Sequence, residues 1–146
     1  MHLFFTLGIY AAIAVLFGAI EPLPALVAVG PAVLTGVAFQ AASTAYTSHL
    51  DDDYGITNVM RFVIMPMFLF SGTFFPVSQL PDWLEPVAAF TPLFHGVELV
   101  RKLALPGSVP PVVSTIPMWV HLAYLLILAS VSWVLAVRFL DRRLKP

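Results

Sequence analysis

The sequence contains no cysteine, and only 10% of its 146 residues are charged. The lack of cysteine excludes disulfides, thiolate catalysis and cysteine-ligated metals. The formal net charge is −1 and no basic cluster alternates with aromatic residues, which excludes a nucleic-acid-binding surface. The phosphate-binding motif G-x-x-x-x-G-K-[ST] is also absent, so the chain has no nucleotide site of that kind.

Apolar residues, by contrast, make up 60% of the chain, and its mean hydropathy is +0.93. Ordinary soluble domains contain about 45–50% apolar residues. A chain of this length could not bury so much apolar surface in one core, because small domains keep a large share of their surface exposed. The composition therefore predicts an all-α integral membrane protein, with residues 1–146 forming a single transmembrane domain.

Four apolar segments reach or approach the length of about 20 residues that crosses a bilayer. We expect transmembrane helices over residues 3–20, 23–42, 59–75 and 116–140. Arg61 and the basic residues of the C-terminal segment then lie on one side, against Arg101 and Lys102 on the other. The positive-inside rule places both termini in the cytoplasm, in a multi-pass protein of the cytoplasmic (inner) membrane.

The second expected span carries one face of small residues, completed by an amide, at intervals of four: Ala28, Ala32, Gly36 and Gln40. Small residues let two membrane helices approach closely, and the amide could form a hydrogen bond across the contact. The alternative is that these residues have no specific partner helix. Pro31 and Pro66 each remove one backbone hydrogen bond, which favours kinks in the second and third spans.

A polar segment separates the second and third spans and contains Tyr46, His49, Asp51, Asp52, Asp53 and Tyr54. Its carboxylates and histidine could bind a divalent cation. Successive aspartates point in different directions on a helix, however, and no second acidic cluster lies on this side. A solvated loop with helix-capping aspartates and a docking surface for a cytoplasmic partner are the alternatives.

The stretch after the third span is apolar but interrupted by prolines. Pro81 predicts the start of a short helix over residues 81–89. Thr91 as N-cap, followed by Pro92, predicts a second helix through about residue 103. Both helices are too short to span, so we expect them to dip into the outer leaflet or to cover the spans.

Three ionisable residues of the second short helix, His95, Glu98 and Arg101, are spaced three apart and share one face. Ionisable groups beside a membrane are candidates for a functional site. The alternative is that Glu98 and Arg101 form an ion pair that fixes the short helix, while His95 caps a loop.

The sequence FLFSGTFFPVSQLPDWLEPVAAFTPLFHGVELVR, residues 68–101, resembles the signature region of ABC-2 type transporter permeases. The resemblance is greatest to the branch that contains nodulation protein J and the daunorubicin-resistance membrane proteins. It maps onto Ser71, Gly72, Pro76, Leu80, Pro81, Pro92, His95 and Arg101.

This resemblance implies a six-span permease with cytoplasmic termini, of which the present chain matches the last four spans. Two permease copies would form the pathway among membrane lipids, and a separate ATP-binding subunit would dock below them. The signature residues and Glu98 would then belong to an outer gate, and the polar segment around Tyr46 to Asn58 would contact the ATPase. ATP would be used by that partner, and no cofactor or metal would bind this chain.

The resemblance further implies export of an amphipathic substrate: a drug, a lipid or a lipid-linked saccharide. The chain would be a transport subunit and not an enzyme. Two other functions remain open. The lack of counterparts to the first two spans suggests a noncatalytic membrane scaffold or a nonfunctional permease remnant. A metal-dependent membrane enzyme is the lesser alternative, because the carboxylates occur in one run only.

Overall fold

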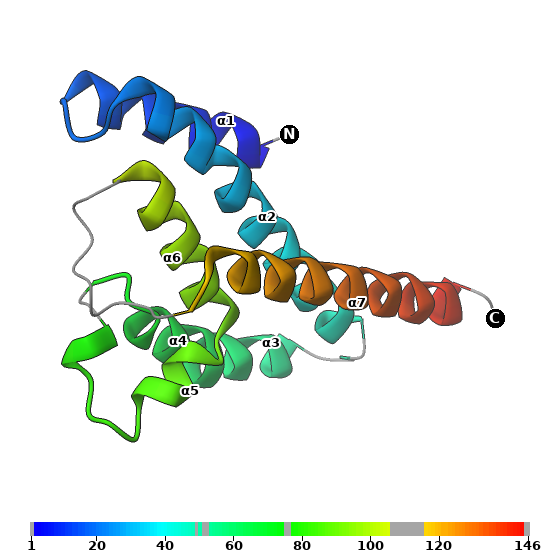
Figure 1. Cartoon of the computed structure of the whole chain (residues 1–146). Helices are drawn as coiled ribbons and strands as arrows, with labels where there is room; N and C mark the ends of the chain where they lie inside the picture. Colours follow the sequence, from blue (N-terminus) through cyan, green and yellow to red (C-terminus); the bar gives the residue numbers. More distant parts are fainter. Residues whose placement is uncertain (1, 49, 51–52, 75–76, 106–115, 145–146) are drawn as a thin grey trace.

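The computed structural model describes residues 2–48, 50, 53–74, 77–105 and 116–144, and these residues form helices and turns only (Figure 1). The all-helical class expected from the sequence is confirmed. The helices are α1 (His2–Leu16), α2 (Pro22–Thr47), α3 (Asp53–Val59), the π-helix η1 (Met60–Ile64), α4 (Met65–Phe70), the 3₁₀ helix η2 (Val77–Gln79), α5 (Glu85–Ala89), α6 (Pro92–Ala104) and α7 (Met118–Leu144).

Two helices of the described part are long and apolar enough to cross a membrane, over Pro22–Thr47 and Met118–Asp141. They correspond to the second and fourth expected spans. The helical stretches Leu3–Leu16 and Tyr54–Phe70 are apolar but shorter. A total of four full spans therefore stays a prediction.

The first helix ends at Leu16, and its expected continuation to residue 20 is wrong. Gly18 has a φ of +67°, which ends the helix in the left-handed conformation that glycine adopts without strain. The amides of Gly18 and Ala19 donate to the carbonyls of Val15 and Ala14 at 3.0 and 2.9 Å, so the last turn is capped by backbone groups.

The second helix continues past its expected end at residue 42 and reaches Thr47. Hydroxyl groups satisfy carbonyl oxygens of this added turn: Thr47 Oγ1 donates to Thr44 O at 3.3 Å, and Ser48 Oγ donates to Ala45 O at 2.8 Å. Because the next helix already begins at Asp53, the expected polar segment between the spans is largely helical at both ends. His49, Asp51 and Asp52 lie outside the described residues.

The third helical stretch begins six residues before the expected position 59, and it contains a wide π-helical turn over Met60–Ile64. Pro66 lies one residue after this turn, in the first turn of α4. A proline ring clashes with the carbonyl four residues before it in a regular α-helix, and a wider turn relieves that clash. A kink was expected at Pro66, and the structure shows a π-helical turn just before it.

Of the two short helices expected after α4, the first begins later than predicted and the second begins where predicted. Residues 81–84 form a turn closed by the Leu84 amide and the Pro81 carbonyl at 2.8 Å, so α5 begins only at Glu85, beside Pro86 in its first turn. The start of α6 at Pro92 is confirmed. Thr91 is its N-cap, with the Phe94 amide donating to Thr91 Oγ1 at 3.4 Å.

Helix α2 is the central element, since it packs against α1, α6 and α7, and α6 also packs against α7 (Figure 1). The C-terminal end of α2, the start of α3 and the end of α7 lie on one side of Figure 1, whereas the α1–α2 turn, η2 and α5 lie on the other. Helix α6 thus lies against the sides of α2 and α7. Whether it enters a leaflet stays a prediction.

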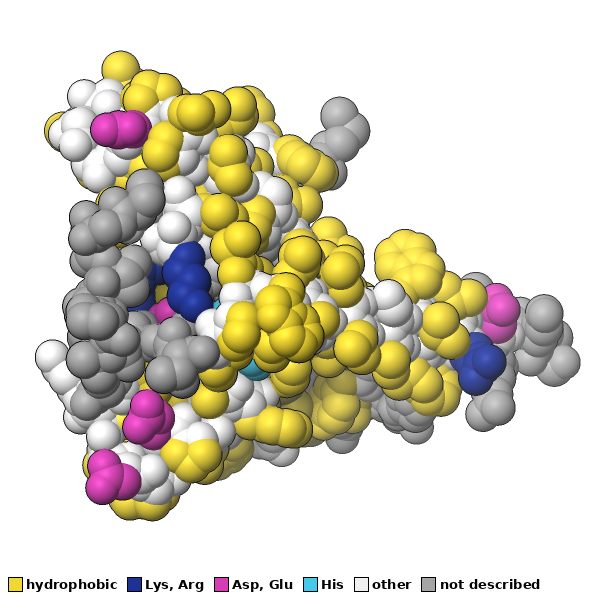
Figure 2. All heavy atoms as spheres, in the orientation of Figure 1, with side chains coloured by type: hydrophobic (Ala, Val, Ile, Leu, Met, Phe, Trp, Pro, Cys, Tyr) yellow, Lys and Arg dark blue, Asp and Glu magenta, His cyan; other side chains and the backbone are white. Residues whose placement is uncertain are grey.

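The surface of the protein is mostly apolar. Large side chains such as Phe5, Phe62 and Trp133 are 71%, 71% and 63% exposed. In the view of Figure 2, the charged side chains lie at the left side and at the right end, and the surface between them is hydrophobic side chains mixed with uncharged groups and backbone. A contiguous apolar surface of this extent is unusual for a soluble monomer and suits a lipid environment.

Candidate functional site

Ser71 and Gly72 form the turn that ends α4. They are the first two of the signature residues in chain order. Ser71 is fully buried, and its hydroxyl donates to Phe68 O at 3.2 Å and lies 2.8 Å from Thr73 Oγ1. Gly72 has a φ of +85°, a conformation that other residues adopt only with strain. The turn therefore requires glycine for its backbone.

The remaining signature positions are distributed around this turn. Leu80 packs against a buried cluster that joins η2, α5 and α6. Pro81 is exposed and Pro92 is the first residue of α6, whereas Pro76 lies outside the described residues. The structure thus groups Ser71, Gly72 and Leu80 near α6 without bringing all the signature residues into one cavity.

Glu98 and Arg101 form an ion pair that also connects α6 to the end of α4. Arg101 Nη1 donates to Glu98 Oε1 at 3.2 Å, and Arg101 Nη2 donates to the carbonyl oxygen of Gly72 at 2.7 Å. The Glu98 side chain is fully buried and that of Arg101 is 24% exposed. The ion pair expected from the spacing is present. The second partner of Arg101, the Gly72 carbonyl, lies 29 positions away in the sequence.

His95 does not cap a loop, because it lies inside α6 and faces α7. Its Nδ1 atom is 2.8 Å from Nδ1 of His121, and its ring stacks on that of Tyr124 at a centroid distance of 4.0 Å. Burial lowers the pKa of His95 below its usual value of 6.5, and the backbone of Ala89 opposes this shift. The buried imidazole is therefore neutral at pH 7.

Sequence reasoning did not identify three of the residues that hold α6 in place. Tyr124 donates its hydroxyl hydrogen to the carbonyl oxygen of Phe90 at 2.7 Å, and Lys102 Nζ donates to that of Ile116 at 2.9 Å. His121 is the third. The spacing of His121 and Tyr124, three apart on one helix, could have indicated a shared polar face on α7.

We expect the Gly72→Ala variant to unfold at a lower temperature than the wild type, because alanine in the left-handed region costs about 1–2 kcal/mol. Gly72→Asn should lose less, since asparagine tolerates this region better. Thermal unfolding in detergent micelles, followed by circular dichroism, measures both. Gly8→Ala is the matched control, because a Cβ at Gly8 meets nothing within 4 Å. Equal melting temperatures for the Gly72→Ala and Gly8→Ala variants would contradict the expectation.

The face of α2 that was expected to pack contains both covered and uncovered residues. Ala28 is buried, Ala32 is half-buried, and a Cβ at Gly36 would come within 2.8 Å of the Leu3 side chain on α1. Gln40 is exposed. The contact with α1 is thus established at Gly36, and Gln40 is not covered.

The docking candidates lie where α2 ends and α3 begins. Tyr46 and Tyr54 are 44% and 77% exposed, and Asp53 is the first residue of α3. The described residues contain no group of three histidine or acidic side chains that could hold a metal ion, whereas His49, Asp51 and Asp52 lie outside them. A metal site in this segment therefore stays a prediction.

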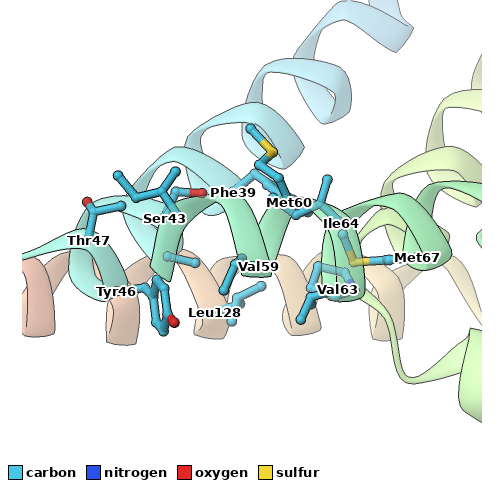
Figure 3. Close-up of a pocket in the computed structure, with 13 residues that line it drawn as sticks. Phe39, Ser43, Tyr46, Thr47, Val59, Met60, Val63, Ile64, Met67 and Leu128 are labelled. Atoms are coloured by element: carbon cyan, nitrogen blue, oxygen red, sulfur yellow. The ribbon is translucent and has the colours of Figure 1, made fainter. Parts of the chain in front are cut away.

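A groove of about 410 Å³ lies beside these residues, between α2 and the continuous stretch α3–η1–α4 (Figure 3). Apolar side chains such as Phe39, Val63 and Met67 form most of its wall. Figure 3 shows Ser43, Tyr46 and Thr47 together at one end, with Val63 and Met67 at the other. The groove therefore offers hydroxyl groups at one end and hydrocarbon along its length, which suits an amphipathic molecule.

A family model described as ABC-2 type transporter matches residues 1–105. Nodulation protein J of Rhizobium leguminosarum bv. viciae is 32% identical over 133 residues, which cover 90% of this chain and 49% of that protein. Nodulation protein J of Sinorhizobium fredii is 36% identical over 114 residues, covering 76% and 40% respectively. That of Rhizobium meliloti is 32% identical over 134 residues, covering 92% and 49%.

The chain spans about half the length of the curated relatives that it matches. No solved structure matches it. The matched region of the family model runs from α1 through the end of α6 and so includes the signature turn, the ion pair and His95.

Proposed function

Because the chain belongs to the ABC-2 type transporter family, we propose that it is the membrane-spanning permease subunit of an ATP-driven exporter, or the C-terminal part of one. The family match over residues 1–105 carries this proposal. In this arrangement the chain contributes the last four of six spans in the cytoplasmic membrane, with both termini in the cytoplasm. It performs transport and leaves ATP hydrolysis to a separate subunit.

The two ends of the helices would have different roles. The ATP-binding subunit would dock where α2 ends and α3 begins, and α5 and α6 would cover the outer end of the pathway. The arrangement in Figure 1 supports this division, since the start of α3 lies on the side where α7 ends and α5 lies on the opposite side. Movement of the ATPase subunits would shift the populations of inward-open and outward-open states through these contacts.

The substrate would be amphipathic: a drug, a lipid or a lipid-linked saccharide. The groove between α2 and α3–η1–α4 supports this class, because its wall is apolar and its hydroxyl groups are confined to one end. A second permease copy would complete the pathway. The exposed apolar side chains of α3–η1–α4, including Phe62 and Met65, leave this stretch open to such a neighbour or to lipid.

Co-purification tests the proposal. The chain, co-expressed with its genomic neighbours, should retain an ATP-binding protein through affinity purification in detergent. Deletion of the chain should abolish export of the substrate. If no ATP-binding protein is retained and export continues after deletion, the proposal is wrong.

Tyr54→Ala should weaken retention of the ATPase by about fivefold to tenfold, because tyrosine is enriched among the interface residues that contribute more than about 1 kcal/mol. Trp83→Ala is the matched control. Trp83 is similarly exposed, at 70% against 77% for Tyr54, but it lies between η2 and α5, on the opposite side. Titration of the purified ATPase onto chain held in nanodiscs measures both affinities. Loss of binding in the Trp83 variant alone would reverse the proposed topology.

A further inference from the structure

Two histidines meet where α6 packs against α7. The Nδ1 atoms of His95 and His121 are 2.8 Å apart, and the two residues are only 5% and 0% exposed. At this distance one Nδ1 carries a hydrogen and donates it, while the other Nδ1 accepts with its lone pair. The pair as observed is therefore complete when both imidazoles are neutral.

The surroundings of the pair are aromatic. The Phe94 ring lies 5.4 Å from that of His95 and 5.8 Å from that of His121, and Tyr124 stacks on His95. The Tyr124 hydroxyl is directed away to the carbonyl of Phe90. Nε2 of His121 is buried and has no hydrogen-bond partner among the described residues.

The charged and titratable groups near this contact come from few elements. On α6 itself they are Glu98 and Arg101, which pair with each other, and Lys102, which donates to the carbonyl of Ile116 just before α7. On α7 they are His121 and Tyr124; the more distant Arg138 and Asp141 lie toward its other end. Helix α5 contributes the exposed Glu85, α2 has Tyr46 at its far end, and α4 has none.

Protonation destabilises the contact between His95 and His121. One added proton leaves a single hydrogen between the two Nδ1 atoms but places a charge in an aromatic, desolvated site near Lys102. If His121 is the donor of the pair, the added proton lies on its buried Nε2, which makes no hydrogen bond with the described residues. A second proton places hydrogens on both Nδ1 atoms, so that two charged donors face each other. Separation of the rings and their hydration relieve all of these costs.

We propose that His95 and His121 form a proton-sensitive latch, which holds α6 against α7 at neutral pH and releases it in acid. An imidazole in water has a pKa of about 6.5, and burial favours its neutral form. The open state therefore binds more protons than the closed state once the pH falls below about 6.5. The latch is fully stable above that pH and weakens as the pH decreases through it.

Hydrogen–deuterium exchange of the full chain in lipid nanodiscs tests the latch. Intrinsic amide exchange is itself slower at pH 5.0 than at pH 7.5. The measured rates are therefore divided by the intrinsic rates, and the resulting protection factors are compared. We expect the protection of α6 to fall at least about tenfold between these conditions, since each extra proton bound by the open state contributes a factor of ten per pH unit. The protection of α2 should change by less than about twofold, because this helix contains no histidine, aspartate or glutamate.

The matched variant is His95→Asn with His121→Asn, in which two amides can form the same side-chain hydrogen bond without titrating. Its α6 protection should not depend on pH. His95→Phe with His121→Phe is a second variant, since replacing both partners by apolar rings is often nearly neutral for stability. The proposal is wrong if α6 protection in the wild type is independent of pH, or if both double variants lose protection in acid as the wild type does.

Discussion

Replacement of Arg101 by methionine is expected to lower the free energy of unfolding by about 3 kcal/mol. Glu98 is fully buried, and the variant removes the guanidinium that pairs with it at 3.2 Å. Breaking a buried ion pair costs about 3–5 kcal/mol, and the low end applies because Arg101 is itself 24% exposed. The same change removes the hydrogen bond to the Gly72 carbonyl, so α6 should also detach from the end of α4.

Unfolding in mixed detergent micelles, followed by tryptophan fluorescence, measures this loss. Arg138→Met is the matched control, because Arg138 is exposed on α7 and its variant should stay within about 0.5 kcal/mol of the wild type. Glu98→Gln combined with Arg101→Met removes both charges and should recover part of the loss. Similar stabilities of the two single arginine variants would show that the ion pair contributes little.

The second large effect is expected at Gly96, where α6 crosses α2. A Cβ at this position would lie 2.5 Å from Cγ2 and 2.9 Å from Cβ of Thr35. The Thr35 side chain cannot easily rotate away, because its hydroxyl donates to the carbonyl of Pro31 at 2.8 Å. Gly96→Leu should therefore force the two helices apart and cost about 3 kcal/mol, the upper part of the range for an overpacked core.

The same unfolding assay tests Gly96→Leu, with Gly30→Ala as the control. Gly30 is a helical glycine of α2 with no atom within 4 Å of an added Cβ, so this change should be neutral or slightly stabilising. Thr35→Gly combined with Gly96→Ala moves the small residue from one helix to the other and should tolerate the added methyl group. If Gly96→Leu is as stable as Gly30→Ala, the helices do not meet closely here.

Local sequence rules predicted the start of α6 and the pairing of Glu98 with Arg101. Both depend on neighbours within four positions: Thr91 and Pro92 define the beginning of the helix, and a spacing of three places the two charged groups together. The helical class also followed from the long apolar runs, since a helix satisfies its own backbone polar groups in lipid.

The extent of the helices and the long-range partners could not be predicted in this way. The conformation of Gly18 ended α1 early, although the apolar run continues to Ile20. The hydroxyl bond of Ser48 helped α2 to continue, although the apolar run stops at Ala42. His121 lies 26 positions from His95, and nothing in the local pattern identifies two such residues as neighbours. Only the packing of α6 against α7 brings them together.

The π-helical turn at Met60–Ile64 also affects how this chain is compared with others. Such a turn behaves as one residue inserted into an α-helix, and in a regular helix one residue rotates everything after it by about 100°. A homologue whose corresponding helix is regular would need one residue fewer here to present the Ser71–Gly72 turn in the same direction. In a sequence alignment, a gap of one position in such a homologue just before Pro66 would then be compatible with the same arrangement of the helices.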